Sequence, residues 1–284
     1  MGLASHNLSM RNLLRLGLML LLALLVGADN LSEVFRIRQV DVGNGIVLYG
    51  RNNLGSDITV HVWLTRAENV VATPPAPLIM PIEGGREVKL MEIRQRRSAD
   101  AWNVRYDSHW AHGNILARHD DSVIYSLPYP SGQRHRIIQG YFGTFSHQGD
   151  DAYSLDFDFD EGTPVHCCRE GVVVAVQDVY GPGRATADFR EKANYVRVRH
   201  SDLTIAEYTH LTRGGVLVEP GQPVERGTLL GYSGSSGYAS GPHLHFFVYR
   251  ASDGHRRQSL PVRFRIAGQS GGVELQQGAS YAAP

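Results

Sequence analysis

The residues whose spacing most directly suggests chemistry are two histidines in the run Ser240-Gly241-Pro242-His243-Leu244-His245-Phe246. β-Forming residues follow the chain break at Gly241-Pro242, so this segment predicts a strand. Side chains on one face of a strand recur every second residue, which would place both imidazoles on the same face, about 7 Å apart. That spacing suits one metal ligand beside one catalytic group. It also suits two hydrogen-bonded histidines at a strand end, so the rest of the chain must decide.

Four further polar residues are candidates for the same face, namely His147, Asp151, Asp156 and His210. Asp156 lies in an alternating segment, residues 153–160, that has one apolar face and one acidic face. Two histidines and one carboxylate around an open fourth position form the pattern of a catalytic zinc site. Zinc in such a site polarises a carbonyl and lowers the pKa of bound water to about 7. Because these residues come from separate segments, spacing alone does not assemble the site.

The elements that must position these side chains are predicted to be strands throughout. The chain of 284 residues contains 31 Gly and 13 Pro, and short alternating runs separated by turns dominate it. Residues 29–125 are predicted to form an N-terminal β-sandwich-like domain, and residues 126–265 a second, catalytic β domain. Residues 266–284, rich in Gly, Ser and Ala, are predicted to be a flexible C-terminal tail.

The N-terminus has the pattern of a secretory signal. Arg11 and Arg15 precede an apolar run, residues 16–26, and small residues follow it, so residues 1–28 are predicted to be a cleaved signal peptide. The run is shorter than the roughly 20 residues of a typical spanning helix, and an uncleaved anchor is the alternative. We therefore expect an exported protein without stable membrane insertion after cleavage. The balance of 28 basic and 28 acidic side chains argues against a nucleic-acid partner.

The cysteines are two adjacent residues, Cys167 and Cys168. Neighbours on a strand point to opposite faces, which opposes a disulfide between them. We interpret both as small apolar packing residues, with a vicinal disulfide as the alternative.

Several sequence blocks, in order, resemble the lysostaphin-type (LytM-like) zinc endopeptidases, which cut peptidoglycan cross-link peptides. The resemblance spans about residues 125–248, and its most specific blocks are those around His210 and His243-Leu244-His245. The blocks are Ser146-His147, Leu155-Asp156-Phe157, Glu161-Gly162-Thr163-Pro164-Val165, Arg169-Glu170-Gly171-Val172-Val173, Asn194-Tyr195-Val196, Tyr208-Thr209-His210-Leu211, Val218-Glu219-Pro220-Gly221-Gln222-Pro223-Val224, Leu230-Gly231-Tyr232-Ser233-Gly234 and Ser240-Gly241-Pro242-His243-Leu244-His245-Phe246.

This resemblance implies a mostly antiparallel β domain whose groove holds one Zn²⁺. By motif position it implies metal ligands at His147, Asp156 and His245, and catalytic roles for His210 and His243.

The identity of the carboxylate ligand depends on one departure from the family pattern. Many relatives place this carboxylate four residues after the first histidine, which here is Asp151. We prefer Asp156, because it lies six residues before Gly162 of the Gly-Thr-Pro-Val block and alternates with the apolar face of its segment. A longer loop, residues 148–152, would absorb the difference.

The resemblance implies an exported zinc metallo-endopeptidase that hydrolyses amide bonds in the peptide stems of peptidoglycan. Zinc-bound water would be the nucleophile, with His210 or His243 as general base and the other, or the zinc, stabilising the oxyanion. The alternative is a non-catalytic cell-wall regulator of the same fold that binds and activates amidases. The chain keeps every expected polar position, which favours the enzyme. Whether it would cut a D-Ala–diaminopimelate or a Gly–Gly bond stays open.

Overall fold

The computed structural model describes residues 34–284, so the predicted signal peptide, residues 1–28, lies outside the described part. The described residues form strands, and their only helical segments are two 3₁₀ turns, η1 (Gly149–Asp151) and η2 (Ala187–Phe189). The predicted all-β class is confirmed. Within residues 34–284, no helix is long and apolar enough to cross a membrane.

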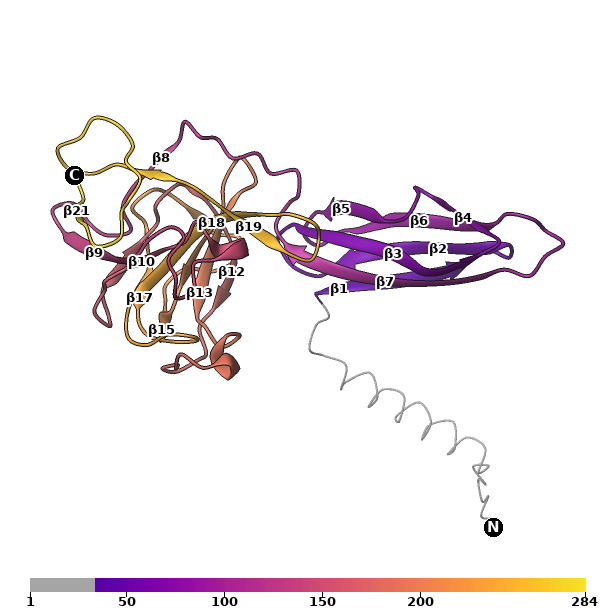
Figure 1. The fold of residues 1–284 in the computed structure, drawn as a ribbon, viewed down its shortest axis with the longest axis horizontal. Coiled ribbons are helices and arrows are strands. Elements are labelled where there is room, and N and C mark those ends of the chain that lie inside the picture. Colours follow the sequence, from indigo (N-terminus) through magenta and orange to yellow (C-terminus); the bar gives the residue numbers. More distant parts are fainter. Residues whose placement is uncertain (1–33) are drawn as a thin grey trace, which may run out of the picture. The chain divides into compact units, whose positions relative to one another are not determined.

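The first strands of the described chain form two antiparallel sheets, ordered β1-β2-β6-β4 and β5-β3-β7 (Figure 1). Ile82 of one sheet and Leu90 of the other both approach Gly50, which shows that their inner faces pack together. The predicted sandwich-like arrangement is present, whereas the division into domains stays a prediction. The strands are β1 (Phe35–Asp41), β2 (Gly45–Asn52), β3 (Ile58–Glu68), β4 (Val70–Thr73), β5 (Leu78–Ile82), β6 (Glu87–Gln95) and β7 (Asn103–His112).

The largest sheet carries the candidate site. Its order is β16-β12-β13-β14-β18-β10-β9-β21, with β19 paired to β18, and all neighbours are antiparallel. The mostly antiparallel β fold that the resemblance implies for this part of the chain is therefore observed. The strands are β9 (Arg134–Gln139), β10 (Leu155–Phe157), β12 (Gly171–Gln177), β13 (Tyr195–Arg199), β14 (Ile205–Thr209), β16 (Pro223–Val224), β18 (Leu244–Ala251), β19 (Arg257–Leu260) and β21 (Ser280–Ala282).

A smaller sheet of β11 (Pro164–His166), β17 (Leu229–Ser233) and β15 (Leu211–Val216) shares a core with the large sheet. Leu230 of the small sheet and Tyr208 and Phe246 of the large one are completely buried in this core. Both cysteines are free and buried in it, in agreement with their interpretation as packing residues. A parallel pair, β8 (Ile124–Tyr125) and β20 (Arg263–Phe264), completes the strands.

The C-terminal segment differs from the predicted flexible tail. Its strand β21 pairs with β9, with Ser280 opposite Arg136, and Leu275 and Ala283 are buried in the core. Residues 266–284 are rich in small residues and show no alternating pattern, but strand pairing uses backbone groups. Without β21, β9 would be an edge strand with unpaired N–H and C=O groups, and the tail satisfies them.

Candidate metal centre and its groove

Strand alternation turns the candidate residues toward one face of the large sheet. Leu244 and Phe246 of β18 enter the core, so His245 between them faces the opposite side. In the register of the sheet, His245 lies opposite Asp156 of β10 on one side and opposite Thr209 of β14 on the other. Residues 36 and 89 positions before His245 in the sequence thereby become its neighbours.

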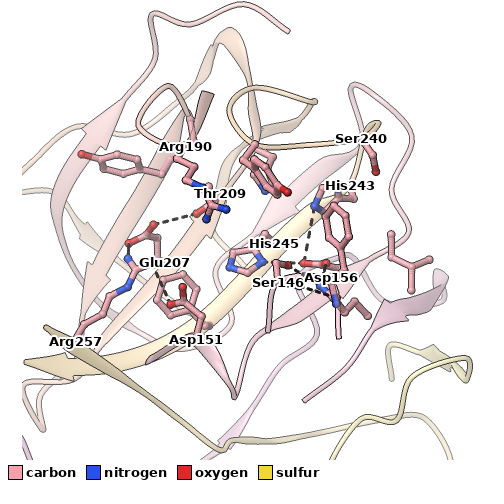
Figure 2. Close-up of a pocket in the computed structure, with 18 of the residues that line it drawn as sticks. Ser146, Asp151, Asp156, Arg190, Glu207, Thr209, Ser240, His243, His245 and Arg257 are labelled. Atoms are coloured by element: carbon pink, nitrogen blue, oxygen red, sulfur yellow. Dashed lines mark hydrogen bonds and ion pairs between the residues drawn. The ribbon is translucent and has the colours of Figure 1, made fainter. Parts of the chain in front are cut away.

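Three donor atoms converge at this face, from His147, Asp156 and His245, the residues at which the family resemblance implies metal ligands. Figure 2 shows two of these side chains, Asp156 and His245, next to each other. The distances are 3.2 Å from His147 Nε2 to Asp156 Oδ1, 3.3 Å from His147 Nε2 to His245 Nδ1, and 2.8 Å from His245 Nδ1 to Asp156 Oδ1. Zinc bonds of about 2.0–2.1 Å give a tetrahedron whose edges are about 3.3 Å. The donor triangle therefore fits one face of a tetrahedral zinc centre. It is the single such group found in residues 34–284.

Two neighbouring groups orient these donors. The Nδ1–H of His147 donates to the carbonyl of Gly140 at 2.9 Å, which leaves the lone pair of Nε2 directed at the site. The side-chain amide of Gln139 donates to Asp156 Oδ2 at 2.9 Å, so that Oδ1 remains for the site. Sequence reasoning missed both partners, because neither belongs to a recognisable motif. Only the pairing of β9 with β10, which sets Gln139 opposite Asp156, identifies Gln139.

Electrostatics make Asp156 the anion that the two histidines share. Burial alone would raise the pKa of Asp156, but the imidazoles of His147 and His245 beside its carboxylate hold this pKa well below its usual value. Burial opposes the charged form of His245, yet its hydrogen bond to Asp156 leaves the pKa of His245 raised. A carboxylate that is ionised, buried and aimed at two imidazoles is the donor chemistry that a divalent transition metal requires.

His210 and His243 lie beside the triad with their ring centroids 4.5 Å apart. The Nδ1–H of His210 donates to the carbonyl of Ser236 at 2.6 Å, and that of His243 to the carbonyl of Gly241 at 2.9 Å. Carbonyl oxygens only accept, so each ring presents the lone pair of Nε2. Burial lowers the pKa of His210 to about 3, with His243 and His245 adding to the shift, and burial also lowers the pKa of His243. Both rings are therefore neutral bases at pH 7.

The backbone places His210 at a sharp turn. It is the single residue between β14 and β15, and its φ of 68° lies in the left-handed region, which costs a non-glycine residue energy. This conformation ends the strand of the large sheet and starts the strand of the small one. The imidazole is thereby held in the groove, although the side chain of Tyr208, two residues earlier, is in the core.

The site opens into a groove of about 660 Å³. Phe145 and Tyr238, which line it, stack with ring centroids 5.8 Å apart, and Arg190 lies over the Tyr238 ring.

Asp151, the alternative carboxylate ligand, lines the groove but is outside the donor triad. It belongs to η1 and forms an ion pair with Arg257 at 3.1 Å. The geometry therefore agrees with the preference for Asp156.

The comparisons with known proteins give the class. The sequence profile described as "Peptidase family M23" matches residues 150–258, so this chain contains a peptidase family M23 domain. The matched range includes Asp156, His210, His243 and His245, and His147 lies just before it.

Several of the relatives that match are endopeptidases by name. The chain is 37% identical over 91 residues to the peptidoglycan DD-endopeptidase ShyA of Vibrio cholerae, covering 32% of this chain and 18% of ShyA. It is 34% identical over 99 residues to the glycyl-glycine endopeptidase ALE-1 of Staphylococcus capitis, covering 34% of this chain and 24% of ALE-1. The chain thus spans less than a third of the length of either relative.

Among solved structures, the catalytic domain of the antimicrobial peptidase lysostaphin from Staphylococcus simulans aligns at 25% identity with a TM-score of 0.32. The alignment covers 45% of this chain and 88% of that domain.

Proposed function

We propose that this protein is an exported zinc metallo-endopeptidase that hydrolyses amide bonds in peptidoglycan cross-link peptides. One observation carries the proposal. Three donor atoms with the edge lengths of a zinc tetrahedron lie in the same groove as two neutral histidines whose Nε2 atoms are free to accept a proton. The M23 domain and the endopeptidase relatives support the substrate class.

In this proposal the residues of the triad and their neighbours have distinct tasks. His147, Asp156 and His245 would hold the ion, and Gly140 and Gln139 keep His147 and Asp156 in their orientations. A zinc ion bound there would polarise the scissile carbonyl and lower the pKa of water in its open position.

His210 and His243 would handle the proton. Hydrolysis adds the hydroxyl of water to the carbonyl carbon, breaks the C–N bond and delivers one proton to the leaving nitrogen. The Nε2 of either histidine can accept the proton of the attacking water, because its Nδ1–H is already committed to a backbone carbonyl. The imidazolium so formed then carries an Nε2–H that can stabilise the developing oxyanion or protonate the amine. The two rings are 4.5 Å apart, so both reach the same substrate.

Metal content and hydrolysis, measured together, test the proposal. We expect the purified protein to contain one zinc per chain by elemental analysis and to release peptides from isolated peptidoglycan, with a chelator abolishing and zinc restoring the release. His245→Ala should lose both zinc and activity. His210→Ala and His243→Ala should keep zinc and lose about 10²–10⁴-fold in rate. His255→Ala, an exposed histidine outside the groove, is the matched control and should keep both.

The non-catalytic regulator is the competing outcome of the same experiment. If the protein binds peptidoglycan but contains no metal and cleaves nothing, the proposal of an enzyme is wrong and the regulator is the function that remains. Full activity of His245→Ala in the absence of zinc would overturn the ligand assignment.

A further inference from the structure

Next to the metal centre, the groove contains a charged cluster with two arginines. Arg197 Nε donates to Glu207 Oε2 at 2.7 Å, and Arg257 Nη1 lies 3.4 Å from the same oxygen. Thr209 donates to the other oxygen, Oε1, at 3.1 Å. Glu207 is therefore buried, and both of its carboxylate oxygens have partners. Of the two arginines, Arg257 makes the longer contact with Glu207. Arg257 is therefore the arginine that Glu207 holds less tightly.

The second partner of Arg257 is Asp151, and this pair is loosely built. Arg257 Nη2 lies 3.1 Å from Asp151 Oδ1, with one third of each side chain exposed (33% and 35%). Asp151 Oδ1 is itself buried and makes no hydrogen bond to any described residue, so the contact is an ion pair without hydrogen-bond geometry. Ion pairs with this degree of exposure contribute little, about 0–1 kcal/mol. A bidentate carboxylate on a guanidinium is considerably stronger.

The position of Arg257 fits a substrate group close to the scissile bond. The ring of Phe247 lies 5.3 Å from that of His245, and the guanidinium of Arg257 lies 4.4 Å from the Phe247 ring. One aromatic side chain thus separates Arg257 from the metal centre. Figure 2 shows Arg257, Glu207 and Asp151 gathered on the side of His245 that faces away from Asp156. A peptide residue spans at most about 3.6 Å, so these two steps together correspond to at most about three residues.

We propose that Arg257 binds a carboxylate of the substrate peptide, and that Asp151 holds this guanidinium until that carboxylate displaces it. The inference rests on the proposed function and deepens it, because it selects among cross-links. A cross-link through a diamino-dicarboxylic acid such as diaminopimelate carries a free carboxylate next to the scissile amide, whereas a glycine bridge carries none. Arg257 is then a specificity-determining residue, and the substrate is the carboxylate-bearing cross-link.

Two peptides that differ at one group provide the test. One is a D-alanyl–diaminopimelate cross-linked peptide with the free carboxylate beside the scissile amide, and the other is the same peptide with that group converted to a carboxamide. Dissociation constants are measured by calorimetry with chelator present, where no hydrolysis competes, and kcat/KM is measured separately with zinc. Pentaglycine is the third substrate. We expect amidation to weaken binding and lower kcat/KM by about tenfold or more, and pentaglycine to be cut poorly.

Variants locate the effect. In Arg257→Gln the free and amidated peptides should bind equally, and Arg257→Lys should recover part of the difference, since it keeps the charge but not the bidentate geometry. Arg256→Gln is the matched control, because its side chain is 61% exposed and lies outside the groove, and it should discriminate like the wild type. Asp151→Asn should tighten binding of the free carboxylate about twofold to fivefold, because the internal competitor is lost.

The outcomes separate the inference from the proposed function. Equal affinity of the wild type for both peptides, with hydrolysis intact, overturns the inference alone. A tenfold preference for the free carboxylate without any hydrolysis supports the inference and removes the proposed function. If Arg257→Gln does not fold, the wild-type comparison and Asp151→Asn still decide. Weaker binding in Asp151→Asn would show that Asp151 supports the site rather than competing for it.

Discussion

Gln139 offers the sharpest test of how the protein prepares the metal centre, because its side chain serves two segments. Its amide group donates to Asp156 Oδ2 at 2.9 Å and to Ser146 Oγ at 2.8 Å. Its carbonyl oxygen accepts from the backbone N–H groups of Phe145 and Ser146 at 3.1 Å and 3.3 Å. One buried side chain therefore fixes both Asp156 and the loop that leads into His147. Gln139→Met keeps the length and bulk of this side chain and removes all four hydrogen bonds.

The expected magnitude follows from what each hydrogen bond does. A hydrogen bond to a charged group contributes about 1.5–3 kcal/mol, so loss of the bond to Asp156 should weaken zinc binding about 10- to 100-fold. The other three bonds are neutral and hold the loop before His147, so the zinc-free protein should lose about 1.5–4.5 kcal/mol of unfolding free energy. The drop in zinc affinity is therefore a separate effect from the drop in folding stability. It arises because Oδ2 of the buried Asp156 loses the hydrogen bond that orients the carboxylate.

Zinc affinity is measured by competition with a chromophoric chelator, and stability by denaturant unfolding with chelator in excess. Gln148→Met is the matched control, since Gln148 lies on the same loop, is exposed, and donates only to the Thr144 carbonyl at 3.0 Å. It should change zinc affinity by less than about twofold. A Gln139→Met protein that folds and binds zinc as tightly as the wild type would refute the role of Gln139.

Further predictions concern the loop, the turn and a distant carboxylate. In Gly143→Ala a Cβ would lie 2.3 Å from Cγ of Gln139, so chelator competition should show weaker zinc binding, as for Gln139→Met. His210→Gly should be about 1 kcal/mol more stable than His210→Ala in denaturant unfolding, because φ is 68° there, and both should be inactive. Burial opposes ionisation of Asp202, but hydrogen bonds from Thr204 and Arg169 lower its pKa from 3.8 to about 2. The stability that Asp202 provides is therefore complete above pH 4 and should disappear as the pH falls to about 2. Asp202→Asn should flatten unfolding curves across this range and cost about 2 kcal/mol at pH 7.

Alternation in the sequence predicted the strands of the large sheet closely. The run that follows Gly241-Pro242 is predicted to be a strand and forms the start of β18, and the alternating segment 153–160 contains β10. These strands bury one face and line a groove with the other, so their apolar and polar residues alternate with a period of two. The strand β21 was missed, because it is attached by backbone pairing to β9 and shows no such pattern.

The order of strands in the sheet was beyond the reach of the sequence pattern. β18 lies between β14 and β10, so His245 acquires neighbours from positions 209 and 156, and no local rule specifies this pairing. The set His147, Asp156 and His245 therefore came from family resemblance, and the structure supplies the convergence that spacing could not. Gln139 and the carbonyls that bind the histidines became visible only with the coordinates, since any residue type provides a backbone carbonyl.

The choice between Asp151 and Asp156 shows why spacing along the chain is a weak guide to a metal site. Asp156 is fixed in a strand whose register sets it opposite His245, so its carboxylate must face the donors. Asp151 lies in the 3₁₀ turn η1, within the loop that lengthens the interval after His147, and this turn directs it to Arg257. The added loop residues therefore do more than separate His147 from Asp156. They bring a carboxylate of the protein itself to the guanidinium that we propose for the substrate, at the position that the substrate carboxylate would take.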